Sequence, residues 1–169
     1  MRRLILFRHA KAESRPPDGE DIDRALTARG RHDAALVATV LARAGLTPDL
    51  ALVSPALRAR ETWQCAQDAF AGVETQVRDG LYNAAPEEVA DELDVGTQGA
   101  ETVIVVGHNP SLQELSVRLL LGGDGSAGDV ERVSASFATA TAAAFRIDAA
   151  GRAALEGVFH ARDHGGDGE

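Results

Sequence analysis

The sequence predicts a three-layer α/β/α sandwich with a mostly parallel central sheet. Three short apolar runs, at 4–7, 50–53 and 102–106, are typical of strands that are buried on both faces. Segments with helical periodicity lie between these runs, and such alternation favours parallel strands with helices on both faces of the sheet. The length of 169 residues, 44% of them hydrophobic, suits one domain with a sizeable core, which we expect over residues 1–162.

The first strand, 4–7, leads into a polar segment and then into the first helix. Residues 13–24 contain two prolines, a glycine and a cluster of acids, so we expect an exposed loop there. Thr27 can cap a helix that runs to about Ala44, because Gly45 follows as a typical helix end. The apolar face of this helix should pack on the sheet.

The second strand, 50–53, is followed directly by Ser54 and Pro55. Serine is a preferred N-cap and proline suits the first helical position, so we expect the second helix to begin there. Residues 73–78 predict a weaker and more polar strand, and residues 86–93 predict a short acidic helix.

The last third of the chain predicts a helix, a flexible connection and a hairpin. The helix covers 111–121, and the glycine-rich segment 122–128 lacks the spacing of a dinucleotide-binding loop, so we interpret it as a flexible connection. Residues 136–147 and 153–160 favour a hairpin that adds an antiparallel edge to the sheet. We expect the tail, 163–169, to be disordered.

Composition excludes several classes of function. The chain has 17 Lys and Arg against 26 Asp and Glu, a net charge of −9, so we expect no nucleic acid or membrane partner, and any anion site must be local. The single cysteine, Cys65, can form neither an intramolecular disulfide nor a cysteine-based zinc site. The single lysine, Lys11, lies between two alanines, which excludes a P-loop. Without a membrane-spanning apolar stretch or a signal-like N-terminus, we expect a cytoplasmic protein.

Two arginines and two histidines follow the three predicted core strands. Arg8 and His9 come after the first strand, Arg58 after the second and His108 after the third. Because ligands of parallel sheets bind beyond the carboxyl ends of the strands, we expect these side chains to converge. Two guanidinium groups can bind a dianion such as phosphate, and a neutral histidine can attack phosphorus through a ring nitrogen.

Four segments resemble, in order, the motifs of the histidine phosphatase superfamily. They are Leu4-Ile5-Leu6-Phe7-Arg8-His9-Ala10-Lys11-Ala12-Glu13, Leu26-Thr27-Ala28-Arg29-Gly30, Ser54-Pro55-Ala56-Leu57-Arg58-Ala59-Arg60-Glu61-Thr62 and Val105-Val106-Gly107-His108-Asn109-Pro110. The resemblance covers about residues 1–121 and implies a phosphoglycerate mutase-like fold.

The same resemblance implies roles for individual residues. His9 would be the nucleophile that forms a covalent phosphohistidine intermediate, and Arg8, Arg58 and His108 would bind the phosphoryl group. We expect Asn109 and Ser54 to support substrate binding, although a capping or turn role explains each equally well. This scheme requires no metal ion and no cofactor.

Within this superfamily, the short chain and the motif Arg8-His9-Ala10-Lys11-Ala12-Glu13 resemble those of the SixA-like phosphohistidine phosphatase branch. Many relatives carry a glutamate as general acid near Leu81-Tyr82-Asn83, where this chain has Asn83. Loss of that acid is tolerable for phosphohistidine, because imidazole is a better leaving group than an alkoxide. Carboxylates that could replace it are Glu13, Asp18, Glu87 and Glu88.

The sequence therefore leaves three candidate functions. The leading hypothesis is a phosphatase acting on phosphohistidine in a protein, for example a histidine-containing phosphotransfer protein. The alternatives are a phosphomonoesterase for small molecules or for phosphoserine and phosphothreonine, and a non-catalytic phosphate-binding module. The short connections in 79–100 leave little room for a lid, which favours a protein substrate.

Other polar residues have simpler interpretations. We expect His32, His160 and His164 to be exposed to solvent. The pair Arg60-Glu61 either orients Arg58 or forms a surface ion pair.

Overall fold

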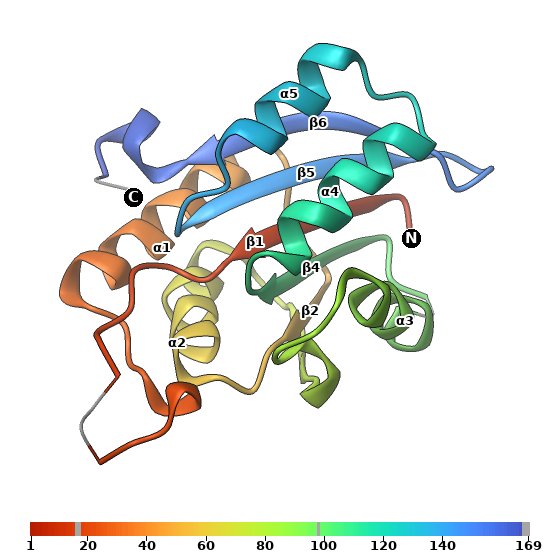
Figure 1. Cartoon of the computed structure of the whole chain (residues 1–169). Helices are drawn as coiled ribbons and strands as arrows, with labels where there is room; N and C mark the ends of the chain where they lie inside the picture. The colour runs from red at the N-terminus through yellow and green to blue at the C-terminus, as the bar shows by residue number, and fades with distance from the viewer. Residues whose placement is uncertain (16–17, 98, 167–169) are drawn as a thin grey trace.

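The computed structural model describes residues 1–15, 18–97 and 99–166, and within these ranges it forms a six-stranded sheet (Figure 1). The strand order is β3-β2-β4-β1-β5-β6. The strands are β1 (Arg3–Arg8), β2 (Leu50–Val53), β3 (Glu74–Val77), β4 (Thr102–Gly107), β5 (Thr141–Ile147) and β6 (Ala153–His160). Strands β1 to β4 are parallel, whereas β5 is antiparallel to β1 and to β6. This confirms the mostly parallel sheet with an antiparallel edge.

Helices cover both faces of the sheet (Figure 1). They are α1 (Ala28–Arg43), α2 (Leu57–Ala66), α3 (Pro86–Gly96), α4 (Ser111–Gly122) and α5 (Ala127–Ala135), with short 3-10 helices η1 (Asp21–Asp23), η2 (Gln67–Ala69), η3 (Asp79–Leu81) and η4 (Ala161–His164). Ile5 and Phe7 face the core under α1 and α2, whereas Leu4 and Leu6 face the core under α3, α4 and α5. Alternate residues of β1 therefore serve two cores, which is why its sequence is continuously apolar. The three-layer sandwich is confirmed.

The start of α1 is tied to the segment that follows β1. Thr27 caps the helix as predicted, since its Oγ1 accepts a hydrogen bond from the Gly30 N–H at 2.9 Å. The Thr27 N–H in turn donates to the Lys11 carbonyl. A Cβ atom at Gly30 would lie only 2.1 Å from that carbonyl oxygen, so only glycine allows this close approach. The helix thereby supports the chain immediately beyond His9.

The predicted start of α2 at Ser54 is wrong. The helix begins at Leu57, with Ala56 at the N-cap position, and Pro55 lies in the turn before it. The Ser54 N–H continues the sheet pairing by donating to the Val106 carbonyl, so this residue still belongs to the strand end. Because Ser54 does not cap α2, its hydroxyl can bond to a residue that follows the neighbouring strand β4.

The C-terminal third contains a helix that the sequence interpretation missed. Helix α5 begins at Ala127, inside the predicted flexible connection, and Ser126 caps it by accepting from the Asp129 N–H at 3.1 Å. The predicted strand 136–147 begins only at Thr141, and in the segment before it the Phe137 carbonyl accepts from Arg8 and the Ala140 N–H donates to the His9 carbonyl. Helix η4 includes Asp163 and His164, the first residues of the predicted disordered tail, and 167–169 lie outside the described residues.

One histidine also differs from the prediction. His160 is buried, and its Nδ1 lies 2.9 Å from the Thr141 hydroxyl, its partner residue across β5 and β6. The strand pairing thus supplies a polar partner for a ring that the sequence interpretation placed in solvent. Within the described ranges, no helix is long and apolar enough to cross a membrane.

Candidate active site

A cavity of about 770 Å³ lies beyond the carboxyl ends of β1, β2 and β4. Its lining includes five of the residues that the sequence predicted to form a site: Arg8, His9, Arg58, His108 and Asn109. They come from separate parts of the chain and meet because their strands are neighbours in the sheet. Ser54 contacts His108 at the same sheet edge without lining the cavity.

His9 is held in the tautomer that a nucleophile needs. Its Nδ1 lies 2.8 Å from the Ala10 carbonyl oxygen, which can only accept, so Nδ1 carries the proton and Nε2 keeps a lone pair. The ring is only 9% exposed. Burial, together with the positive charges of Arg58 and Arg8, lowers the pKa of His9 to about 4, despite the opposing bond to Ala10. His9 is therefore a neutral base at pH 7.

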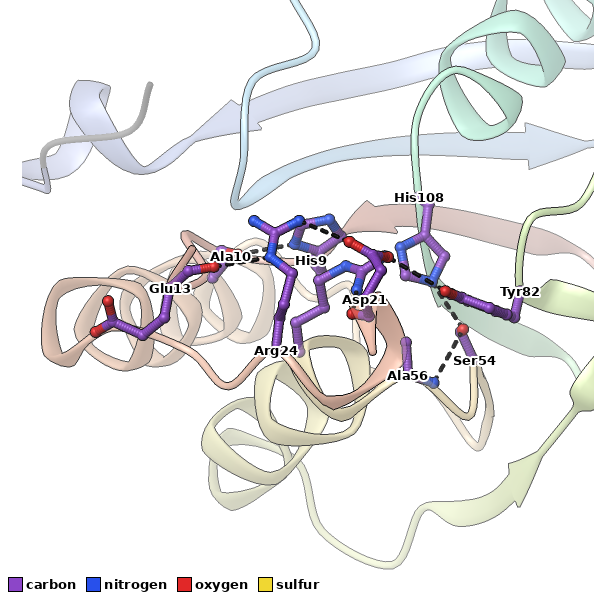
Figure 2. A network of polar contacts seen from close by, with 10 residues as sticks. His9, Ala10, Glu13, Asp21, Arg24, Ser54, Ala56, Tyr82 and His108 are labelled. Atoms are coloured by element: carbon purple, nitrogen blue, oxygen red, sulfur yellow. Dashed lines mark hydrogen bonds and ion pairs between the residues drawn. The ribbon is translucent and has the colours of Figure 1, made fainter. Parts of the chain in front are cut away.

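His108 lies beside His9, with 5.1 Å between the ring centroids. Ser54 Oγ lies 2.7 Å from its Nε2 and also accepts from the Ala56 N–H at 3.4 Å (Figure 2). Ser54 is fully buried, and among the described residues Nε2 is the acceptor within reach of its hydroxyl proton, so we assign that proton to the bond with Nε2 and the ring proton to Nδ1. Burial and the neighbouring His9 and Arg58 lower the pKa of His108 to about 3. Among the described residues, Nδ1 has no hydrogen-bond partner.

Arg8 is supported by a backbone carbonyl. Its Nη1 donates to the Phe137 oxygen at 2.7 Å, and the Asn109 side-chain amide donates to the same oxygen at 3.0 Å. The Gln113 amide donates to the Val133 and Ser134 carbonyls at the end of α5, so this helix anchors the supporting segment. The Nε of Arg8 is buried and has no hydrogen-bond partner in the described parts of the chain.

Arg58 is supported by Asp21, which the sequence interpretation did not single out. Its Nη1 donates to the Asp21 carbonyl at 2.7 Å, and its Nη2 lies 3.0 Å from the Asp21 carboxylate. The same carboxylate accepts from Arg24 at 3.1 Å and from the Tyr82 hydroxyl at 3.2 Å (Figure 2). As in Arg8, the Nε of Arg58 is buried without a partner in the residues described.

Comparison with known proteins identifies the family. A sequence model of the histidine phosphatase superfamily (branch 1) matches residues 4–90, more than half of the chain. The chain belongs to this superfamily. An uncharacterized protein of Mycobacterium tuberculosis is 37% identical over 145 residues, which cover 83% of this chain and 87% of that protein.

Several solved structures share the fold over nearly the whole chain. A candidate phosphohistidine phosphatase SixA from Agrobacterium tumefaciens is 30% identical, with a TM-score of 0.81 over 93% of this chain and 96% of that chain. A second candidate SixA, from Nakamurella multipartitia, is also 30% identical, with a TM-score of 0.82 over 94% and 95%. A candidate α-ribazole-5'-P phosphatase from Escherichia coli shares the fold at 19% identity, with a TM-score of 0.69 over 95% and 98%.

The carboxylates expected to replace the superfamily's general acid are engaged elsewhere or exposed. The Glu13 carboxylate points away from both histidines in Figure 2, and Asp18 is exposed. Glu87 pairs with Arg118, and Glu88 accepts from the Ala85 N–H at 2.6 Å. Asp21 is thus the loop acid that contacts the site.

Two further positions test the sequence predictions. Asn83 does line the cavity, at a backbone φ of 54°, in the left-handed region that asparagine tolerates. Glu61 does not orient Arg58: it accepts from the Leu26 N–H at 2.6 Å and pairs with Arg31 at 2.7 Å. The only signal for Asp21 was its charge in a loop that precedes α1, and this does not distinguish it from its acidic neighbours.

Proposed function

We propose that the protein is a phosphatase that hydrolyses phosphohistidine on a protein through a covalent intermediate on His9. One observation carries this proposal. The Nε atoms of Arg8 and Arg58 and the Nδ1 of His108 have no hydrogen-bond partner within 1–15, 18–97 and 99–166, and all three belong to residues that line the cavity, as does His9. Buried donors without partners are unfavourable unless a ligand completes them, and a phosphoryl group offers oxygens to all three.

The chemistry follows from the tautomer of His9. Its Nε2 attacks phosphorus, the bond from phosphorus to the substrate nitrogen breaks, and that electron pair leaves with the substrate imidazole. The Nδ1–H donates to the Ala10 carbonyl throughout, which stabilises the positive charge on the phosphorylated ring. Water then attacks phosphorus, the bond to Nε2 breaks, and one water proton passes to phosphate or solvent. The scheme needs no metal ion and no cofactor.

Two observations support phosphohistidine as the substrate class. Asn83 lines the cavity, where the family resemblance implies a glutamate in many members, and a side-chain amide cannot protonate an alkoxide. Imidazole needs no such donor when it leaves. The two solved structures with 30% identity are both named as candidate phosphohistidine phosphatases. We therefore propose a phosphorylated partner protein, such as a histidine-containing phosphotransfer protein, and a cytoplasmic location.

The second candidate is a phosphomonoesterase for small molecules. A cavity of about 770 Å³ accepts more than a phosphate group, and Lys11 and Arg24 extend its cationic lining. Solved structures named for α-ribazole phosphatase and for mycobacterial glucosyl-3-phosphoglycerate phosphatase share the fold. A non-catalytic binding module is less well supported, because binding alone does not require the His9 tautomer.

Rates on one enzyme preparation separate these candidates. We expect fast hydrolysis of a phosphohistidine protein, intermediate rates with aryl phosphates and slow hydrolysis of a phosphoserine peptide and sugar phosphates. Faster turnover of a sugar phosphate than of the phosphohistidine protein would select the phosphomonoesterase.

The nucleophile is tested by His9→Ala. We expect this variant to lose hydrolysis while keeping its thermal unfolding temperature within a few degrees, because His9 lies past the end of β1. Rapid quench of the wild type should trap acid-labile phosphate on the enzyme, and the variant should trap none. An active His9→Ala enzyme would contradict the assignment.

Asn83→Glu tests the missing acid. We expect it to raise turnover of alkyl phosphates selectively, because a glutamic acid can protonate the leaving oxygen. Asn83→Gln is the matched control, since it adds the same length without an acid. Equal effects of the two variants would show that proton donation at this position is not limiting.

A further inference from the structure

Asp21 places a negative charge against the cations that bind the phosphoryl group. Its carboxylate touches Arg58 and Arg24, both of which line the cavity, and the Tyr82 hydroxyl, whose ring packs edge-on against His108 at 5.8 Å. Figure 2 shows the carboxylate between Arg24 on one side and Tyr82 and His108 on the other. The loop that carries η1 and the loop after η3 therefore meet through Asp21 at the edge of the cavity.

A carboxylate in this place is unfavourable for binding a dianion alone. It neutralises part of the Arg58 and Arg24 charge, and it repels phosphate oxygens that approach the same guanidinium groups. The Asp21 backbone carbonyl accepts from Nη1 and the carboxylate lies against Nη2, but a neutral acceptor such as an amide oxygen could take the place of the carboxylate at Nη2. The negative charge of the Asp21 carboxylate would instead favour a substrate that carries a positive group beside its phosphoryl group.

Phosphohistidine has such a part and phosphomonoesters do not. The ring nitrogen remote from phosphorus can carry a proton near neutral pH, which makes the leaving group a neutral imidazole when the bond breaks. His9 has the same requirement after phosphorylation, and the Ala10 carbonyl holds its remote N–H. The substrate ring needs a matching acceptor on the other side of the phosphoryl group.

We propose that Asp21 is the specificity-determining residue, whose carboxylate attracts and holds the protonated imidazole of a phosphohistidine substrate. This inference rests on the proposed function, because it names what selects that substrate class at the same site. The Asp21 carboxylate is 44% exposed, so it is open to an incoming ring, and its bonds to Arg24, Arg58 and Tyr82 keep it oriented. Burial is the largest single effect on the pKa of Asp21 and raises it, but the bonds to Arg24, Tyr82 and Arg58 and the Arg58 charge together outweigh burial and lower the pKa, which keeps the carboxyl charged at pH 7.

The test compares Asp21→Asn with Asp23→Asn. An asparagine can still accept from Arg58, so the first variant removes the charge while keeping the support. Asp23 lies two residues away in η1, is exposed and carries the same charge, so the second variant controls for long-range electrostatics. For each enzyme, kcat/KM is measured with a phosphohistidine protein and with an aryl phosphate, and vanadate affinity is measured by calorimetry.

For Asp21→Asn we expect the ratio of the two kcat/KM values to move about tenfold toward the aryl phosphate, with tighter vanadate binding, because an attraction and a repulsion are both removed. Asp23→Asn should leave the ratio unchanged. If both substrates slow equally and vanadate binds more weakly, Asp21 only positions Arg58, and the inference is overturned.

Failure of the proposed function can be distinguished from failure of the inference about Asp21. The proposed function fails if the wild type does not hydrolyse phosphohistidine, whatever Asp21→Asn does. A wild type that prefers phosphohistidine, combined with an unchanged ratio in Asp21→Asn, would overturn the role of Asp21 alone.

Discussion

Arg8 and Arg58 offer the same guanidinium chemistry to the cavity but rest on different supports. Arg8 donates to the Phe137 carbonyl, a neutral group in a segment anchored by a buried phenylalanine side chain. Arg58 lies against the carboxylate of Asp21, a charged residue at the start of the partly exposed helix η1. A carbonyl fixes direction and leaves the arginine charge intact, whereas a carboxylate fixes direction and partly cancels that charge. The position of Arg8 therefore depends on the packing of the segment around Phe137, whereas the position and effective charge of Arg58 depend on the Asp21 carboxylate.

The largest effect should come from replacing the arginines themselves. We expect Arg8→Lys and Arg58→Lys each to lower kcat/KM by about 100-fold or more, because an ammonium group cannot reproduce the planar fork of donors. Steady-state kinetics with an aryl phosphate measures the loss. Unchanged vanadate affinity in Arg58→Ala, measured by calorimetry, would place Arg58 outside the binding site.

The pH dependence of stability tests the comparison further, because the positive charges of both arginines lower the pKa of His9. The folded-state pKa of His9 is about 4 against 6.5 for an ordinary histidine, so the unfolded chain binds this proton more readily. The free energy of unfolding should be unaffected by this group above about pH 6.5 and should fall by about 3 kcal/mol as the pH drops toward 4. Chemical denaturation at several pH values checks the size and sign.

The two arginines should differ in this titration. Burial is the main cause of the low pKa of His9, and the Arg58 charge contributes more than that of Arg8. Arg58→Ala should therefore raise the pKa of His9 more than Arg8→Ala does, as followed by NMR of the ring protons. The reverse order would mean that the Asp21 carboxylate already cancels the Arg58 charge at His9.

A smaller effect is expected at the anchor of the Arg8 support. Gln113→Met removes the donors to the Val133 and Ser134 carbonyls, and we expect about tenfold weaker vanadate binding. In an Arg8→Ala background the same change should have no further effect, whereas in Arg58→Ala it should add. Gln64→Met, on the exposed face of α2, is the control. Additivity in both backgrounds would show that Gln113 does not act through Arg8.

The smallest effect concerns the hydroxyl behind His108. Ser54→Ala removes the 2.7 Å bond to Nε2, and one neutral hydrogen bond contributes about 1 kcal/mol, so we expect a threefold to tenfold loss of kcat/KM, roughly. Ser54→Thr should restore most of the activity if its methyl group fits. Full activity of Ser54→Ala would leave this bond without a role in catalysis.

The parts of the fold that were predictable have local signals in the sequence. The central strands β1, β2 and β4 are continuous apolar runs because both faces are buried, and Thr27 caps α1 through its own side chain. The convergence of Arg8, His9, Arg58 and His108 followed from their places after strands. Helix α5 was missed because the segment that leads into it, 122–128, is rich in glycine, although Ser126 and Asp129 form a capping box there.

The supports of the two arginines could not be predicted in the same way. The Phe137 carbonyl belongs to the backbone, and no residue type marks a carbonyl that will meet Arg8 more than 100 positions away in the chain. Asp21 reaches Arg58 only because the loop folds back over the start of α2, and Asp18 and Asp23 look equivalent in the sequence. His160 was misplaced for a related reason, since its partner Thr141 is set by strand pairing.

The backbone origin of the Arg8 support has a consequence for inheritance. A carbonyl is present whatever residue occupies position 137, so a substitution at that position cannot remove the acceptor; it can only disturb the core. A single base change converts an aspartate codon into an asparagine codon, and at position 21 it would remove the charge while leaving the fold in place. If Asp21 selects the substrate as proposed, substrate preference should change more readily through position 21 than through position 137, where the acceptor for Arg8 is kept by every residue type.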